Sequence, residues 1–141
     1  IYKEKDLYTL VGVSTSVLTD PSQQLTVRQY SIFFRILFNA SFLSRKHSEE
    51  VLKLLTQTTY NDGLVAGVPQ GVMVAHKFGE RKFDDSLQQV HDCGIVYYPK
   101  HPYLLCVMTR GSDSTVLSGA IAEVSRFVYN RIDAQYGKAQ N

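Results

Sequence analysis

The sequence is poor in cysteine, in charge of one sign and in long hydrophobic runs. Its two cysteines are too few for a disulfide-rich scaffold. The four histidines and two cysteines show no zinc-site spacing, so we expect no metal or other cofactor. No apolar run approaches the roughly 20 residues that span a bilayer, and the start has no signal-peptide pattern. The net charge of +2 is too small to indicate a nucleic-acid partner.

What is present is the composition of an ordinary globular domain. The 141 residues are 44% hydrophobic and 20% charged, which fits one domain. Because the chain starts with Ile1 and not with methionine, we expect a processed product or a fragment. We interpret 1–141 as a single partial domain, with a helical part and an N-terminal segment at 1–70, antiparallel strands at 71–110, a C-terminal helix at 111–135 and a frayed tail at 136–141.

Two helices are predicted in the first half of the chain. Thr26, followed three residues later by Gln29, forms a capping box at the start of a helix over 26–39. A second helix is predicted over about 44–57, with its apolar face formed by leucines and a valine. The first helix has an apolar stripe that we interpret as core and not as a ligand site: Tyr30, Phe33, Phe34, Leu37 and Phe38.

Three strands are predicted after a turn-rich stretch at 58–71. They cover 72–77, 92–98 and 103–109, and the last two are joined by a short hairpin connection at 99–102. The second and third strands are apolar on both faces, so we expect helices on both sides of the sheet.

The last predicted element is a long helix over about 112–133. Ser112 or Ser114 can cap it, and the expected buried positions recur at helical spacing. Helices, then antiparallel strands, then a helix is an α+β order. The expected buried stripe of the last helix comprises Leu117, Ile121, Val124 and Val128, with Ala120 and Phe127 alongside.

The first candidate functional residue is Lys77, in a Lys-x-Gly motif. A buried ammonium is costly unless it is paired, so a lysine at the end of a buried-looking strand either reaches solvent or serves a purpose. Gly79, which we expect at the strand end, would allow a ligand to approach the backbone closely. Such a sheet rim can bind a carboxylate, a phosphate or a developing oxyanion. By itself, Lys-x-Gly is a weak motif, and a structural lysine is the alternative.

The surrounding segments resemble the C-terminal part of a penicillin-recognising serine hydrolase of the class A β-lactamase type. The stretches that carry the resemblance are "VAHKFGE" and "HDCGIVYYPKHPYLLCVMTRG", followed by the long helix and preceded by two helices and the "DGLVAGVP" bend. The family has a Lys-Thr/Ser-Gly triad on an edge strand of its sheet. The resemblance covers about residues 24–135. It implies a β-lactamase-like partial fold of three strands and a long C-terminal helix.

The resemblance also implies roles for four residues as the substrate-binding set: Lys77, Phe78, Gly79 and Glu80. Lys77 would bind the substrate carboxylate, and the backbone N–H of Glu80 would form half of an oxyanion hole. Phe78 stands where the family has a threonine or serine, so the hydroxyl that contacts the carboxylate is missing. The carboxylate of Glu80 is also unusual beside an oxyanion, because like charges repel.

The sequence lacks two motifs of the family. No serine is followed by a lysine three residues later, and no Ser-x-Asn occurs. Ser112–Ser114 reads as a helix cap. We therefore expect no catalytic nucleophile in this chain and place it in a preceding segment.

Two functional hypotheses follow from these observations. The first is the C-terminal fragment of a β-lactamase-like serine hydrolase of the bacterial periplasm or exterior, which acylates a serine with a β-lactam or a peptidoglycan-like peptide. Its role would be antibiotic resistance or envelope chemistry, and the isolated chain would be inactive. The alternative is a non-catalytic binding or scaffold module on the same sheet.

The cysteines give a third, weaker possibility. Cys93 and Cys106 lie in apolar strands, where a cysteine is usually an inert small hydrophobe. If the hairpin turns about Lys100, Cys93 lies opposite Val107, and we expect two free thiols. A nucleophilic Cys93 paired with His91 remains an open alternative.

The strand at 103–109 should have an unprotected edge. In the family it is central, and its outer neighbour comes from an N-terminal segment. Unpaired N–H and C=O groups on an apolar edge attract another strand. We expect this edge to be filled by the N-terminal part of the enzyme, by a second copy of this chain, or by 7–17 acting as a donated strand.

Overall fold

The computed structural model describes residues 25–137, and the expected elements within 1–24 and 138–141 lie outside this range. The described part consists of three α-helices, a short 3₁₀ helix and a three-stranded antiparallel sheet, which confirms the α+β class. In chain order these are α2 (Val27–Phe38), α3 (Arg45–Leu55), η2 (Leu64–Gly67), β1 (Val74–Lys82), β2 (Gln88–Val96), β3 (Tyr103–Gly111) and α4 (Ser114–Tyr136).

The first two helices begin at side-chain caps. The predicted capping box of α2 is confirmed: the Thr26 hydroxyl accepts from the Gln29 N–H, and the Gln29 side chain accepts from the Thr26 N–H. Ser44 caps α3 by accepting from the N–H of His47. These caps satisfy backbone donors that a helix start leaves free.

The sheet has the order β1-β2-β3, so β1 and β3 are its edges within the described residues. The first predicted strand was too short. β1 continues past Gly79 to Lys82, because 79–82 pair with residues 88–91 of β2. Gly79 was expected at the strand end, yet the polar residues at 80–82 continue the strand because they pair with β2.

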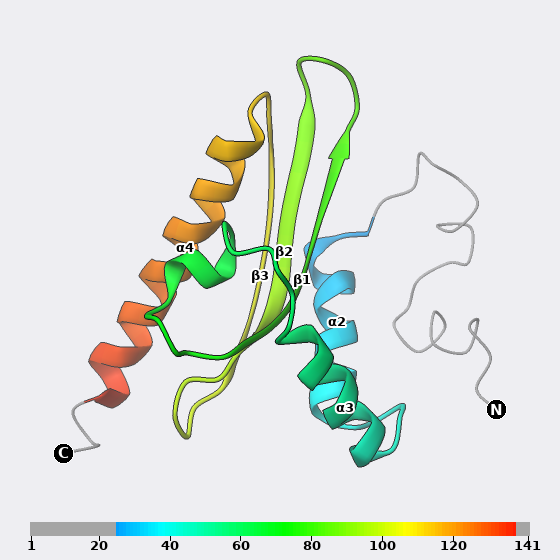
Figure 1. Cartoon of the computed structure of the whole chain (residues 1–141), viewed down its shortest axis with the longest axis vertical. Coiled ribbons are helices and arrows are strands. Elements are labelled where there is room, and N and C mark those ends of the chain that lie inside the picture. The colour runs from blue at the N-terminus through cyan, green and yellow to red at the C-terminus, as the bar shows by residue number, and fades with distance from the viewer. Residues whose placement is uncertain (1–24, 138–141) are drawn as a thin grey trace.

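Helices cover both faces of the sheet, as predicted. Figure 1 shows α4 and η2 on one side of the strands and α2 and α3 on the other. The α4 side holds one apolar cluster and the α2–α3 side holds another. The buried members are Leu64, Val74, Val90, Val96, Leu117 and Ile121 on the α4 side, and Phe34, Leu52, Ala75, Cys93 and Ile95 on the α2–α3 side.

The apolar stripe of α2 was predicted only in part. Phe34 is 3% exposed, whereas Phe38 is 42% exposed and lies outside the core. α2 packs against β2 and β3, where Phe34 belongs to the buried cluster and Tyr30 and Leu37 pack against it.

The buried stripe of α4 differs from the predicted one. Leu117 and Ile121 are buried, but Val124 is 41% exposed and Phe127 is 73% exposed. Small residues of the helix face η2 instead, and a Cβ on Gly67 would lie 2.4 Å from the Cβ of Ser125. This close approach rotates α4 so that its buried residues are Leu117, Ser118, Ile121, Ala122 and Ser125. Asp113 caps the helix, in place of Ser112 or Ser114, by accepting from the N–H groups of residues 115 and 116.

The register between β2 and β3 is shifted by one residue from the predicted one. Cys93 pairs with Cys106, and Asp92 pairs with Val107. Lys100 adopts a left-handed φ of 62° in the turn, which places the turn centre between Pro99 and Lys100. The two cysteines therefore face each other and form a disulfide. The prediction of two free thiols is wrong, and so is the proposed nucleophilic Cys93.

The outer edge of β3 has no strand partner within residues 25–137. Side chains of Tyr103 to Thr109 are all partly exposed along this edge. None of the described helices is long and apolar enough to cross a membrane.

Candidate functional site

The four predicted site residues lie in the middle of β1 and are divided between its two faces. Side chains alternate along a strand. Phe78 therefore points to the α4 side together with Glu80, whereas Lys77 and Gly79 belong to the α2–α3 side. The sheet rim predicted at the end of this strand does not exist at Lys77, because the ladder continues through Lys82.

Lys77 reaches solvent, which answers the question raised by its place in an apolar strand. Its side chain is exposed, and its Nζ donates to the Phe78 carbonyl at 2.6 Å while lying 4.9 Å from the centroid of the Phe78 ring. Its own carbonyl accepts from the Tyr30 hydroxyl at 3.2 Å, which ties the strand to α2. The Lys77 side chain therefore lies in solvent at the edge of the sheet.

His76, the other polar residue of the strand, is buried and paired. Its Nδ1 lies 2.9 Å from Asp92 Oδ1, and both side chains are at most 1% exposed. Asp92 Oδ2 also accepts from the Leu64 N–H at 2.9 Å. A buried carboxylate is tolerated only with such partners. The pair joins β1, β2 and η2 directly behind the candidate site.

The His91 side chain on the neighbouring strand leaves no room for a side chain at Gly79. It pairs with His91, and a Cβ at Gly79 would lie 2.6 Å from the Nε2 of that imidazole. The His91 ring also packs edge-to-face against Tyr30, with centroids 5.2 Å apart. Thus the space that was expected for a ligand on this face is filled by a side chain of β2.

His91 and Tyr30 are both shifted in acidity by this packing. Burial lowers the pKa of His91, and the nearby Lys77 ammonium lowers it further, against the opposing effect of Asp92. Burial raises the pKa of Tyr30 to about 12. The His91 Nδ1 is buried without a hydrogen-bond partner among the described residues. Burial disfavours the charged form of each group, so the imidazole and the phenol are both neutral near pH 7.

On the α4 side, Phe78 forms part of an aromatic stack. Its ring lies 4.1 Å from that of Tyr60, with the two planes at 16°. The Tyr60 hydroxyl donates to Ser118 of α4 at 2.7 Å. Burial raises the pKa of Tyr60, and the carboxylates of Asp92, Asp62 and Glu80 raise it further, while the hydrogen bond to Ser118 lowers it.

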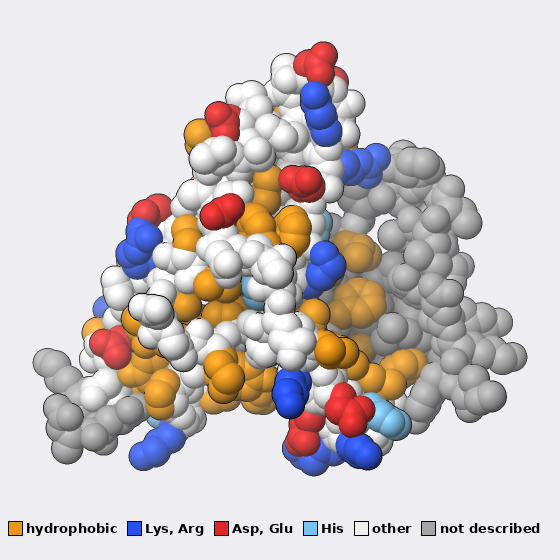
Figure 2. Space-filling model, viewed as in Figure 1, with side chains coloured by type: hydrophobic (Ala, Val, Ile, Leu, Met, Phe, Trp, Pro, Cys, Tyr) orange, Lys and Arg blue, Asp and Glu red, His pale blue; other side chains and the backbone are white. Residues whose placement is uncertain are grey.

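A hollow of about 470 Å³ lies beside this stack, between the first turns of α4, the loop before η2 and the edge of β1. On the face shown in Figure 2, acidic side chains flank a group of hydrophobic side chains beside the upper part of α4. The residues that contribute charge or hydroxyl groups to the hollow are Tyr60, Asp62, Glu80, Ser114, Thr115, Ser118, Glu123 and Arg126.

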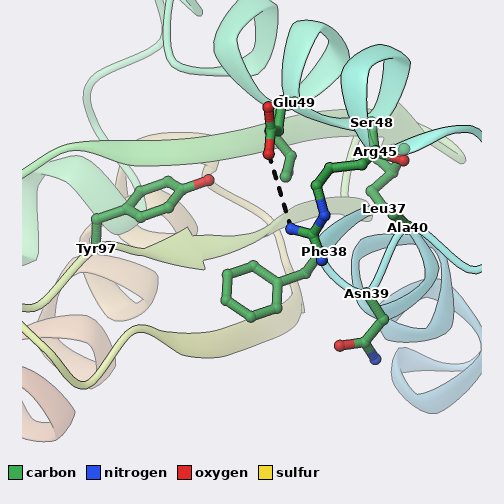
Figure 3. Close-up of a pocket in the computed structure, with 9 residues that line it drawn as sticks. Leu37, Phe38, Asn39, Ala40, Arg45, Ser48, Glu49 and Tyr97 are labelled. Carbon is green, nitrogen blue, oxygen red and sulfur yellow. Dashed lines mark ion pairs between the residues drawn. The ribbon is translucent and has the colours of Figure 1, made fainter.

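A second hollow, of about 440 Å³, lies at the ends of α2 and α3 on the opposite side of the sheet. Figure 3 shows Arg45 above the ring of Phe38 and facing Glu49, with Tyr97 approaching from the other side. The Arg45–Glu49 pair spans 3.8 Å and both side chains are mostly exposed, so it contributes little stability. None of the predicted site residues lines this hollow.

The sequence did not identify Tyr60, His91 or Ser118 as neighbours of the predicted set. Each comes from a different segment, and Tyr60 and Ser118 are 58 positions apart. Only one feature of the sequence could have indicated such a neighbour: Phe78, an aromatic residue at a position where the family has a hydroxyl, favours contact with another aromatic ring. Within residues 25–137, no three His, Cys, Asp or Glu side chains gather closely enough to hold a metal ion.

Comparison with known proteins gives a family and a fold. The model of the β-lactamase enzyme family, Beta-lactamase2, matches residues 5–132. PBP-A is 23% identical with a TM-score of 0.72, covering 92% of this chain and 50% of that one. A class A β-lactamase from Bacteroides cellulosilyticus is 18% identical with a TM-score of 0.72, covering 95% and 48%. The TLA-3 extended-spectrum β-lactamase is 21% identical with a TM-score of 0.72, covering 82% and 46%.

The chain spans about half the length of these solved structures. None of the curated proteins matches it. The family model nevertheless covers most of the chain, and the order of helices, strands and terminal helix agrees with the solved structures. The chain therefore belongs to the β-lactamase enzyme family, and it is similar to the C-terminal part of the class A enzymes.

Proposed function

We propose that this chain supplies one wall of the active site of a β-lactamase-like serine hydrolase, which acts on β-lactams or peptidoglycan-like peptides through an acyl-serine. The nucleophile would come from residues that precede this sequence. The observation that supports the proposal is the exposed Lys77 ammonium on a strand at the edge of the described sheet, where Lys77-Phe78-Gly79 resembles the family's Lys-Thr/Ser-Gly triad. A PBP-A variant has been solved as an acyl-enzyme complex with penicillin G, which supports acyl-serine chemistry on this fold.

The roles proposed for the individual residues follow from this placement. The Lys77 ammonium would attract the substrate carboxylate, and the backbone N–H of Glu80 would stabilise the oxyanion. Gly79 would act indirectly, by leaving room for His91. These roles rest on position within the family fold.

The exposed surfaces of the described part are consistent with a missing N-terminal portion. The outer edge of β3 is unpaired within residues 25–137, and Val116, Val124 and Phe127 expose apolar surface on α4. An unpaired edge and exposed apolar side chains favour association. The occupant would be the N-terminal part of the enzyme or, without it, a second copy of this chain.

The proposed location is the bacterial periplasm or exterior. The disulfide between Cys93 and Cys106 supports this, because disulfides persist in oxidising compartments. In such a location the parent protein would meet β-lactams and peptidoglycan, and resistance to β-lactams would follow if it hydrolyses them.

The experiment that tests the proposal starts from the gene. The coding sequence upstream of residue 1 is read, and the longer protein is incubated with penicillin and weighed intact. We expect a Ser-x-x-Lys motif there and an acyl adduct, and Lys77→Ala should strongly reduce the adduct while changing stability by within about 0.5 kcal/mol.

The 141-residue chain itself should form no adduct and hydrolyse no chromogenic β-lactam. An adduct on one of its own serines would contradict the fragment interpretation. If no Ser-x-x-Lys is encoded upstream, the alternative is favoured, namely a non-catalytic binding or scaffold module that keeps the sheet edge.

A further inference from the structure

Ser48, near the start of α3, is a buried serine whose hydroxyl has no partner. The residue is 1% exposed, and its Oγ makes no hydrogen bond within residues 25–137. The Ser44 carbonyl, four residues earlier, accepts from the Ser48 N–H. By contrast, the buried hydroxyl of Ser125 donates to the Leu64 carbonyl at 2.8 Å. Burying a hydroxyl without a partner costs free energy, so Ser48 is explained better by a bound group than by stability.

The hollow that Ser48 lines has the size of a small-molecule site. Its volume is about 440 Å³, and it lies between the end of α2, the start of α3 and Tyr97, which follows β2. Sites for small molecules measure roughly 300–1,000 Å³ and combine apolar walls with a few polar groups. In Figure 3, Tyr97 faces Phe38 and Glu49 across this space. Phe38 is 42% exposed, so its ring is accessible to a ligand.

The polar groups of this hollow favour an uncharged ligand. Arg45 and Glu49 are the charged residues that line it, and they pair with each other at 3.8 Å, so their charges cancel. Burial raises the pKa of the Tyr97 phenol, which therefore keeps its proton. The Ser48 hydroxyl and the Asn39 amide are neutral as well. A ligand that fits these groups carries hydroxyl and amide groups and no net charge.

The apolar wall adds a requirement for a ring and a small apolar group. A sugar ring has a polar rim and an apolar C–H face, and that face can pack on the exposed ring of Phe38. An acetamido group adds a carbonyl that can accept from the Ser48 hydroxyl and a methyl group that can pack on Leu37 and Leu52. An N-acetylated sugar therefore matches the hollow better than a plain hexose.

We propose that the hollow between α2, α3 and Tyr97 binds an N-acetylated amino sugar, with the Ser48 hydroxyl donating to the acetamido carbonyl. The inference rests on the proposed function for the source of this sugar. Peptidoglycan strands are built from N-acetylated amino sugars, so the site would hold the glycan to which the peptide substrate is attached.

The test compares two trisaccharides that differ in the acetamido group. Chitotriose is the β-1,4-linked trimer of N-acetylglucosamine, and cellotriose is the corresponding trimer of glucose. Each is titrated into the 141-residue chain, and NMR shifts of the backbone amides are followed. We expect saturable shifts at Ser48 and Tyr97 and a chitotriose affinity about three- to tenfold higher, the range for one hydrogen bond. Equal affinities, or no saturable shift at these residues, would overturn the inference.

Two buried serines provide matched variants. Ser48→Ala should reduce chitotriose affinity to that of cellotriose without lowering the urea midpoint of unfolding, because the deleted hydroxyl has no partner in the protein. Ser125→Ala should lower the urea midpoint, because it deletes the bond to the Leu64 carbonyl, and should leave the affinity unchanged. A Ser48→Ala chain that keeps its chitotriose affinity would contradict the assigned role.

The longer protein separates this inference from the proposed function. Chitotriose binding should persist in the longer protein, whether or not that protein forms an acyl adduct with penicillin. Loss of binding there would show that the preceding part of the chain fills the hollow, and would overturn the inference. Sugar binding without an acyl adduct would count against the proposed function alone.

Discussion

The two faces of β1 differ in whether their polar side chains are buried with a partner or exposed to solvent. On the α4 side, His76 is buried and paired with Asp92, whereas Glu80, further along the strand, lines an open hollow. On the α2–α3 side, the His91 ring occupies the space above Gly79, and the Lys77 side chain is exposed to solvent. The comparison teaches that polar residues stabilise the fold only where their partners are buried with them, and that the exposed ones remain available for ligands.

The largest expected effect comes from the buried pair. Asp92→Asn removes the charge that His76 and the Leu64 N–H share, and removing one member of a buried pair costs about 3–5 kcal/mol. Urea unfolding measures the change. Glu49→Gln, which breaks the exposed pair with Arg45, is the matched control and should cost less than about 1 kcal/mol. Equal costs for the two variants would contradict the comparison.

The next effect concerns the disulfide on the α2–α3 side. Its cysteines are 13 positions apart, and closing a loop of about 15 residues stabilises by about 3 kcal/mol. Cys93→Ser combined with Cys106→Ser should therefore lower the free energy of unfolding by about that amount. A thiol titration of the denatured, unreduced chain should find no free thiol. Two titratable thiols would restore the register predicted from the sequence.

A smaller effect is expected at Gly79. Gly79→Ala would bring a methyl group against the His91 ring, and overpacking of this kind costs about 1–3 kcal/mol. Adding His91→Ala should recover part of the loss, which a double-mutant cycle measures. Gly119 has nothing within 4 Å of an added Cβ, so Gly119→Ala should instead stabilise α4 by roughly 0.5–1 kcal/mol. Identical results at both glycines would refute the role of His91.

The smallest expected effect is a dependence of stability on pH. The pKa of His91 is lowered in the folded chain, so the unfolded chain binds the proton first as the pH falls below about 6.5. His91 therefore contributes stability that is present above that pH and is lost as the pH falls toward its folded pKa. Unfolding curves between about pH 7 and pH 5 should show this slope, and His91→Gln should reduce it. An unchanged slope would place His91 in a solvated environment.

Local signals in the sequence predicted much of the fold. The capping box at Thr26 and the serine at Ser44 fixed two helix starts, and the apolar runs of β2 and β3 required helices on both faces. What failed depended on tertiary contacts. The cross-strand partners of 79–82 extend β1, and the left-handed Lys100 shifts the hairpin by one residue, which brings Cys93 onto Cys106.

The consecutive residues of the candidate site were predicted from the sequence, but their neighbours from distant segments were not. Lys77 to Glu80 could be selected because they are consecutive, and the family resemblance gives them their proposed roles. The groups that surround them could not, because Tyr60, His91 and Ser118 approach β1 only through packing of the loop before η2, of β2 and of α4. Alternation along the strand could have separated Lys77 from Glu80 at the outset.

The central claim is that the α4 face of β1 carries uncompensated negative charge at Tyr60. The most direct measurement is an NMR titration of the Tyr60 phenol in the unmodified chain and in Asp62→Asn combined with Glu80→Gln. The account predicts a pKa above the ordinary value of 10.0 in the unmodified chain and a lower pKa in the double variant, because both carboxylates oppose ionisation of the phenol. A pKa that does not change when both carboxylates are removed would contradict it.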